Sequence, residues 1–154
     1  MTTAMRILFV CTGNTCRSAM AAAIARDRLG PGAGVVFESA GLYALDEAPA
    51  TPHAVAAADE LGADLSTHRA RSITRVMVEE ADRIYVMTRS QAEALGHMGA
   101  DLGEKGALLD PAGEDIADPY GGDAASYRHA RNRIAKAVEA RLEEWRAAAG
   151  GGPR

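Results

Sequence analysis

Short apolar segments alternate along this 154-residue chain with longer stretches of helical periodicity. The apolar segments predict strands near residues 5–11, 34–40, 83–88 and 106–110. Residues 17–29 follow the first strand with a helical pattern. Strands that alternate with helices need right-handed crossovers and form a parallel sheet covered on both faces. The pattern therefore predicts an α/β fold, a doubly wound three-layer sandwich around a four-stranded parallel sheet.

Capping residues and one long apolar stripe predict three further helices. Thr51 followed by Pro52 marks a helix start, and Gly62 marks the end of that helix. Ser72 is expected to cap another short helix, and a long final helix is expected from about Asp123. The final helix carries an apolar stripe that predicts core packing rather than a cofactor site: Tyr127, Ala130, Ile134, Val138, Leu142 and Trp145.

Length and composition fit one domain. With 47% hydrophobic residues, the chain can bury a core of its own. We expect the domain to span residues 1–149 and the glycine-rich residues 150–154 to form a disordered tail. A net charge of -4 with dispersed basic residues argues against nucleic-acid binding. The densest basic group, Arg69, Arg71 and Arg75, is expected to form a solvated face.

Apolar stretches are too short for a membrane span. The longest, Ile7 to Val10, covers a small part of the roughly 20 residues that a helix needs to cross a bilayer. The N-terminal residues also lack the apolar core of a signal peptide. We therefore expect a cytoplasmic protein with no membrane partner.

The loop after the first predicted strand carries the strongest chemical signal. It reads Cys11, Thr12, Gly13, Asn14, Thr15, Cys16, Arg17, Ser18 and continues into the predicted helix. Between a strand and a helix start, backbone N–H groups and the positive end of the helix dipole converge on one anion. The same field favours the thiolate form of Cys11, which can attack phosphorus. The planar fork of Arg17 can hold two phosphoryl oxygens.

The context of this loop decides between two interpretations. Gly13 is expected where the backbone turns tightly, and Ser18 is placed to donate a hydrogen bond to the thiolate. The alternative is a buried, inert cysteine in an ordinary strand-to-helix turn. Because 17 of 154 residues are Lys or Arg, a basic residue at a fixed distance from a cysteine often occurs by chance. The strand, turn and helix together favour a phosphate-binding loop.

At these residues the chain resembles the low-molecular-weight protein tyrosine phosphatase family, whose nucleophile loop has cysteine, five residues, arginine and serine. A second match is Asp118-Pro119-Tyr120, which resembles the late family loop that carries the general acid. The resemblance covers nearly the whole chain. It implies that Cys11, Arg17 and Asp118 are catalytic and that phosphorylated proteins are the substrates.

The resemblance also implies supporting residues. Ser39 and His68 fall where the family has them, and with Asn14 and Ser18 they would form the hydrogen-bond network that holds the loop in shape. Taken alone, Ser39 could be a capping residue and His68 a structural histidine.

Three residues near the predicted cleft have structural alternatives. Asp118 precedes a proline, and aspartate in that position is commonly a turn residue. Tyr43 and Tyr120 are candidates for the walls of the substrate cleft, although either could be packing. Ser39, His68 and Asp118 occur along the chain in the same order as in the family, which favours a functional role for Ser39, His68 and Asp118.

Thr15 bears on the choice of substrate. Tyrosine-specific members of the family usually have isoleucine or leucine there, whereas this loop resembles the branch that removes phosphate from protein arginine, as do residues 51–55 and 118–122. A guanidinium leaving group is rich in N–H donors, and a hydroxyl at the rim of the loop offers an acceptor. The alternative is a threonine that is only a β-branched near-isostere, with phosphotyrosine as the substrate.

Cys11 and Cys16 are the only cysteines, and both lie in the loop. Two such residues cannot staple a fold, and a metal site needs more ligands than the loop offers. A disulfide between them would cap the nucleophile reversibly and prevent irreversible oxidation. The alternative is that Cys16 only fills space.

The expected reaction has two steps and needs no metal or organic cofactor. Cys11 attacks phosphorus while Asp118 protonates the leaving group, and Asp118 then activates water to release phosphate. The expected partners are phosphorylated proteins and an opposing protein kinase. Three alternatives are less consistent with the sequence: an arsenate reductase would need cysteines after Cys16, a phosphocysteine carrier would not need Arg17 with Asp118, and a phosphoprotein-binding module would not keep the acid.

Overall fold

A computed structural model describes residues 4–98 and 103–150 of the chain. In chain order the elements are β1 (Met5–Cys11), α1 (Arg17–Leu29), β2 (Val35–Gly41), α2 (Pro52–Asp59), α3 (Arg75–Glu80), β3 (Arg83–Val86), α4 (Arg89–His97), the 3-10 turn η1 (Gly103–Lys105), β4 (Gly106–Leu108) and α5 (Ala124–Gly150). The strands are parallel and lie in the order β2-β1-β3-β4. The predicted fold class is confirmed.

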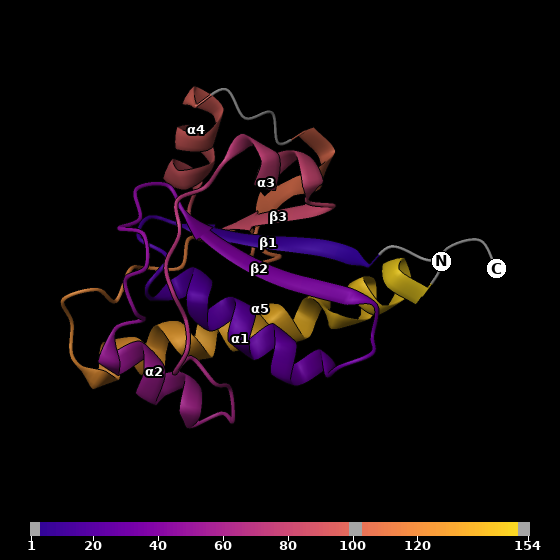
Figure 1. Ribbon diagram of the computed structural model, residues 1–154. Helices are drawn as coiled ribbons and strands as arrows, with labels where there is room; N and C mark the ends of the chain where they lie inside the picture. Colours follow the sequence, from indigo (N-terminus) through magenta and orange to yellow (C-terminus); the bar gives the residue numbers. More distant parts are fainter. Residues whose placement is uncertain (1–3, 99–102, 151–154) are drawn as a thin grey trace.

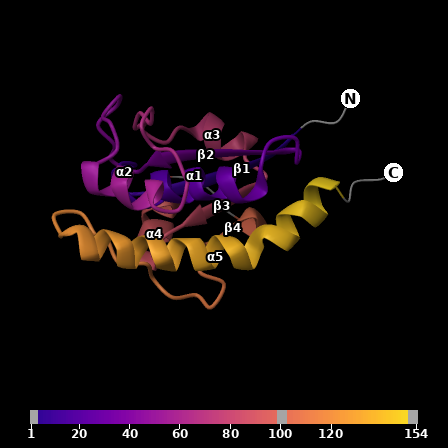
Figure 2. The ribbon, with the colours of Figure 1, turned by 90° about the horizontal axis from the view of Figure 1, so that it is seen from below.

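The sheet is covered on both faces. Figure 1 shows α3 and α4 above it and α1, α2 and α5 below it, and in Figure 2 α5 runs along the lower face beside α1 and α2. The side chains of β1 alternate between the two faces of the sheet. Ile7 and Phe9 pack with the lower helices, and Leu8 and Val10 pack with the upper ones. All four side chains are at most 2% exposed, as expected for a central strand of a parallel sheet.

Aromatic side chains join α5 to the sheet. The ring of Phe9 lies 6.0 Å from each of the rings of Phe37, Tyr85 and Trp145, and Nε1 of Trp145 donates a hydrogen bond of 3.0 Å to the hydroxyl of Tyr85. Burying each of these large side chains stabilises the fold by about 1.5–3 kcal/mol. The predicted stripe of α5 is buried throughout, so its role in the core is confirmed.

Two helix starts show where local sequence signals succeed and fail. The hydroxyl of Thr51 accepts a hydrogen bond from the amide of Ala54 and caps α2, as predicted. The prediction that Ser72 caps the next helix is wrong, since α3 is capped by the hydroxyl of Thr74. Ser72 instead lies beside Gly41 as an extension of the sheet edge, where its amide donates to a side-chain oxygen of Asp46.

Helix α4 has no counterpart among the predicted elements. Thr88 and Gln91 form a capping box at its start, a signal that the apolar pattern alone does not contain. Helix α5 starts one residue after Asp123 and includes Gly150, which was predicted for the tail. The rest of the predicted tail, residues 151–154, lies outside the described residues. Among the described helices, none combines the length and apolarity needed to cross a membrane.

Candidate active site

The loop between β1 and α1 lies at the carboxyl edge of the sheet, the left end in Figure 1. Its carbonyl groups are turned outward: those of Cys11, Thr12 and Thr15 accept hydrogen bonds of 2.9–3.1 Å from the amides of Leu42, Tyr43 and Thr51. Within the described residues, the amides of residues 12–16 donate to no protein group. Successive amides without protein acceptors, next to a helix N-terminus, form a concave site for an anion.

Asn14 fixes the shape of this loop. Its backbone has a φ of 58°, in the left-handed region, and its side chain is fully buried. The side-chain oxygen accepts from the amide of Arg71 at 3.0 Å, and its carbonyl accepts from Nε2 of His68 at 2.6 Å. Gly13 lies in the bend of the loop, as predicted, but the residue in the left-handed region is Asn14, a type that tolerates this conformation.

Cys11 lies at the base of the loop and is 3% exposed. Its sulfur is 2.9 Å from the hydroxyl of Ser18 and 3.4 Å from the amide of Ser18. Nδ2 of Asn14 donates to the Ser18 hydroxyl at 2.8 Å, so the hydroxyl hydrogen is directed to the sulfur of Cys11. Two donors and the N-terminus of α1 therefore face this sulfur.

Arg17 lies beneath the loop and is 4% exposed. Its Nη1 donates to the carbonyl of Ile116 at 2.9 Å, and its Nη2 is 3.4 Å from a carboxylate oxygen of Asp118. Its Nε is buried and has no hydrogen-bond partner among residues 4–98 and 103–150. A buried donor without a partner is costly, and a phosphoryl oxygen above the loop would satisfy it.

Asp118 faces Arg17 from the segment before α5. Its side chain is 49% exposed, and its second carboxylate oxygen accepts from the amide of Tyr120 at 3.0 Å. The residue is thus a turn residue and also a carboxylate at the mouth of the loop. The interpretation of Asp118 as a turn residue is therefore compatible with its interpretation as the general acid.

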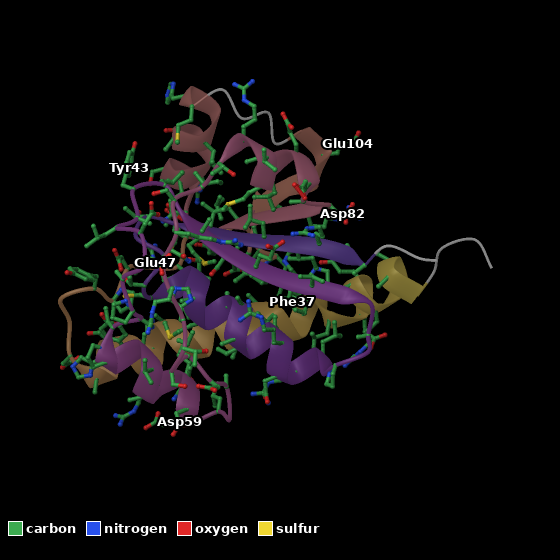
Figure 3. All side chains as sticks on the ribbon, in the orientation of Figure 1. Phe37, Tyr43, Glu47, Asp59, Asp82 and Glu104 are labelled. Atoms are coloured by element: carbon green, nitrogen blue, oxygen red, sulfur yellow. The ribbon has the colours of Figure 1, made fainter. Side chains whose placement is uncertain are left out.

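A pocket of about 450 Å³ lies above the loop and contains Cys11, Arg17 and Asp118. Tyr43 and Tyr120 line it and are 72% and 71% exposed, so neither packs in the core. Figure 3 shows Tyr43 projecting from the same end of the sheet. The sequence did not point to the rest of the outer wall, which is formed by Leu45, Ala48 and Pro49.

The predicted hydrogen-bond network that supports the loop is present, but Arg71 takes part in it where Ser39 was expected. His68 contacts the loop through Asn14, and burial together with the nearby Arg26, Arg69 and Arg71 lowers its pKa. Within the described residues, the hydroxyl of Ser39 makes no hydrogen bond to His68 or to the loop, and Ser39 contributes its carbonyl, which accepts from Nε of Arg71 at 3.1 Å. Arg71, predicted to be part of a solvated face, is half-buried and takes the place expected for Ser39.

Gly41 and Gln91 also position the loop, and the sequence did not assign them this role. A Cβ atom on Gly41 would lie 2.8 Å from the carbonyl oxygen of Thr12 and 3.0 Å from the amide of Asn14, so only glycine fits. The side chain of Gln91 donates to the hydroxyl of Thr12 at 3.2 Å. The glycine after Ser39-Ala40 and the capping box of α4 are the sequence signals that could have found them.

Cys16 is buried on the core side of the loop, and both cysteines are free thiols. Its sulfur lies 3.4 Å from the hydroxyl of Tyr127 and 3.6 Å from that of Thr51. Burial and the contact with Cys16 raise the pKa of Tyr127 to about 12, so this hydroxyl stays protonated at neutral pH. In the described part of the chain, no group of three or more His, Cys, Asp or Glu side chains is arranged to hold a metal ion.

The chain is similar over nearly its whole length to several known phosphatases. A probable low molecular weight protein-tyrosine-phosphatase, EpsP, from Ralstonia nicotianae is 39% identical over 92% of this chain and 96% of its own length. A protein-arginine-phosphatase from Geobacillus stearothermophilus is 35% identical over 90% of this chain and 94% of its own. The solved structure of the YwlE arginine phosphatase from Geobacillus stearothermophilus superposes with a TM-score of 0.88 at 31% identity, covering 97% of this chain and 98% of that one.

The model of one protein family matches nearly the whole chain. It is described as low molecular weight phosphotyrosine protein phosphatase, and the match spans residues 6–149, from β1 to the last turn of α5. The loop geometry around Cys11 and Arg17 and the full-length relatives lead to the same assignment. The chain is a protein phosphatase that belongs to the low-molecular-weight phosphatase family.

Proposed function

We propose that this phosphatase hydrolyses phosphoarginine on proteins through a phosphocysteine intermediate. The proposal rests on the placement of Cys11, Arg17 and Asp118 in one pocket, and on the hydroxyl of Thr15 at its rim. An opposing protein kinase, cytoplasmic location and redox sensitivity belong to the same proposal.

In the first step the Cys11 sulfur attacks phosphorus, and the bond from phosphorus to the leaving nitrogen breaks. The amides of residues 12–16 and the Nε and Nη2 groups of Arg17 stabilise the equatorial oxygens. The carboxyl group of Asp118, at the mouth of the loop, supplies the proton that the leaving nitrogen takes.

In the second step water attacks the phosphocysteine. Asp118, now a carboxylate, accepts a proton from this water, the bond between sulfur and phosphorus breaks, and phosphate leaves. The thiolate of Cys11 returns to its two donors from Ser18. The nucleophile and the group that acts first as acid and then as base are side chains of the chain, Cys11 and Asp118.

The observation that favours arginine is the weakly bonded hydroxyl of Thr15. Within the described residues its one polar contact is the sulfur of Cys16 at 3.8 Å, a weak acceptor and donor. The side chain is half-buried and lines the pocket, so its oxygen is available to a ligand. A guanidinium keeps N–H donors after losing its phosphoryl group, and one of them can bond to Thr15.

Phosphotyrosine is the second candidate, favoured by the two exposed tyrosines. Tyr43 and Tyr120 line the pocket with aromatic surface, which suits a phenyl ring as well as a planar guanidinium. The family contains relatives named for each substrate. The chemistry at Cys11, Arg17 and Asp118 would be the same for both.

Turnover of matched peptides tests the proposal. We would compare kcat/KM for one peptide sequence that carries phosphoarginine or phosphotyrosine, in buffer with a chelator. We expect the phosphoarginine peptide to be the better substrate, and acid-quenched enzyme to contain phosphate on Cys11. A Cys11→Ser variant should lose turnover and still bind phosphate, because a serine hydroxyl is not ionised at this site. A Cys11→Ser variant that turns over normally would remove Cys11 from the role of nucleophile.

A further inference from the structure

A second polar pocket of about 550 Å³ lies along the outer edge of β2. It is lined by charged or polar residues of α1, of β2 and of the segment between α2 and α3: Arg26, Glu38, Asp64, His68, Arg69 and Arg71. It shares no lining residue with the pocket of Cys11. Strand β2 is an edge strand, so this pocket faces outward from the sheet.

Main-chain carbonyls fix the three guanidinium groups of this pocket. Arg26 donates from Nη2 to the carbonyl of Phe37 at 2.6 Å, and Arg71 donates from Nε to that of Ser39 at 3.1 Å. Nη1 of Arg69 donates to the carbonyl of its neighbour His68 at 2.9 Å. A guanidinium carries five N–H donors, so Arg26 and Arg69 retain donors for a ligand.

Positive charge is in excess here. Glu38 is shared between Arg6 at 2.7 Å and Arg71 at 3.0 Å, and Asp64 accepts hydrogen bonds from Ser66. In the part of the chain that the structure describes, neither Arg26 nor Arg69 pairs with a carboxylate.

Burial and the neighbouring positive charges act in the same direction on the protonation of this cluster. The pKa of Arg26 is lowered by burial and by the charge of Arg71, although Glu38 opposes this. Arg26, Arg69 and Arg71 each contribute to lowering the pKa of His68. An anion between these groups would relieve their mutual repulsion.

We propose that this pocket binds a phosphate dianion between Arg26 and Arg69. Two guanidinium groups with free donors match the charge and the oxygens of phosphate. The phosphate is either inorganic phosphate, the product of the reaction, or a second phosphoryl group on the protein substrate.

The site communicates with the catalytic loop through residues 68–71. Nε2 of His68 donates to the carbonyl of Asn14, and the amide of Arg71 donates to its side chain. Asn14 in turn holds Ser18, which donates to Cys11. An anion that draws Arg69 inward therefore acts on the segment that fixes the loop, and occupancy of the pocket alters catalysis.

The direct test is NMR of the Nε–H groups of Arg26 and Arg69 during titration with inorganic phosphate, with sodium chloride of equal ionic strength as the reference. We expect saturable shifts of both signals. Arg69→Gln should abolish the shift at Arg26. Arg83→Gln is the matched control, since Arg83 is also exposed and donates to the carbonyl of its preceding residue, Asp82. Arg69 is exposed, so its variant should fold even where Arg26→Gln does not.

Peptides distinguish the two sources of phosphate. If the substrate supplies the anion, a doubly phosphorylated peptide has a lower KM than the singly phosphorylated one, and Arg69→Gln removes this difference while Arg83→Gln keeps it. If free phosphate is the ligand, the two KM values are equal and the shifts occur with inorganic phosphate alone. Signals of Arg26 and Arg69 that follow only ionic strength, with either ligand, would overturn the proposal.

Discussion

Nη2 of Arg17 lies 3.4 Å from Oδ2 of Asp118, although one residue starts α1 and the other precedes α5. The guanidinium also holds the carbonyl of Ile116, two residues before the carboxylate. Arg17 therefore positions the acid segment as well as the anion site. In our account this contact places the proton donor beside the leaving group of a phosphoryl group held by the loop.

Asp118→Asn should slow substrates with poor leaving groups by about 10²–10⁴-fold, and activated aryl phosphates far less, since only poor leaving groups need a proton in the transition state. The measurement is kcat/KM for both classes of substrate. Asp110→Asn is a matched control, because Asp110 also precedes a proline and accepts from the amide two residues on. Equal losses for both classes would show that Asp118 is only a turn residue.

Oxidation tests the role of Cys16. Mild peroxide should inactivate the enzyme reversibly, and Cys16→Ser should make the loss irreversible, because Cys16 would resolve a sulfenic acid on Cys11. Activity after thiol reductant is the measurement. The contacts of the Cys16 sulfur with Tyr127 and Thr51 show that it also packs in the core, so the variant's thermal stability is checked first. Full recovery of Cys16→Ser by reductant would exclude the protective disulfide.

Acid should destabilise the fold through His68. Its pKa is lowered in the folded state, chiefly by burial, while an unfolded histidine titrates near a pH of about 6.5. Between these two values the unfolded chain binds more protons, so the free energy of unfolding falls as pH drops below about 6.5 and levels off below the folded pKa. His68→Gln keeps a donor for the Asn14 carbonyl without a titrating group. In urea titrations across this pH range, the free energy of unfolding of the variant should fall less with decreasing pH than that of the wild type. An equal fall in both proteins would show that other groups cause it.

Gly41→Ala should reduce activity and destabilise the protein by about 1–3 kcal/mol, because its Cβ would meet the backbone of Thr12 and Asn14. The measurements are kcat/KM and urea denaturation. Gly96→Ala in α4 is the control, since a Cβ there meets nothing within 4 Å and alanine favours a helix over glycine. Normal activity in Gly41→Ala would mean that the loop shifts without consequence.

The sequence predicted those parts of the fold that periodicity and capping determine locally. Helix α1 spans the predicted residues 17–29, and the stripe from Tyr127 to Trp145 is buried as expected. The cap at Ser72 failed because Ser72 pairs with distant Asp46 and Gly41, contacts that no local pattern contains. Helix α4 was missed because it is short and its clearest signal is the capping box of Thr88 and Gln91.

At the site, the sequence supplied the residues that carry chemistry and missed those that act through the backbone. Cys11, Arg17 and Asp118 could be identified because their residue types are those of a nucleophile, an anion-binding group and an acid. The structure places all three in one pocket. The turn at Asn14 and the contact between the amide of Arg71 and Asn14 depend on tertiary packing. Sequence spacing cannot reveal such backbone contacts.

Thr15 carries the central claim, the choice of phosphoarginine. Thr15→Val removes the hydroxyl at nearly constant volume, and Thr15→Ile adds bulk as well. A lost hydrogen bond to a charged group is worth about 1.5–3 kcal/mol, or about a 10-fold to 150-fold change in relative kcat/KM. Thr15→Val isolates this effect, and Thr15→Ile should also raise phosphotyrosine hydrolysis.

The most direct measurement is the ratio of kcat/KM for phosphoarginine and phosphotyrosine versions of one peptide, in wild type, Thr15→Val and Thr15→Ile. Our account predicts a ratio in favour of phosphoarginine in wild type, a fall of about 10-fold or more in Thr15→Val, and a further fall in Thr15→Ile. A wild type that prefers phosphotyrosine, with the same ratio in both variants, would contradict the arginine assignment.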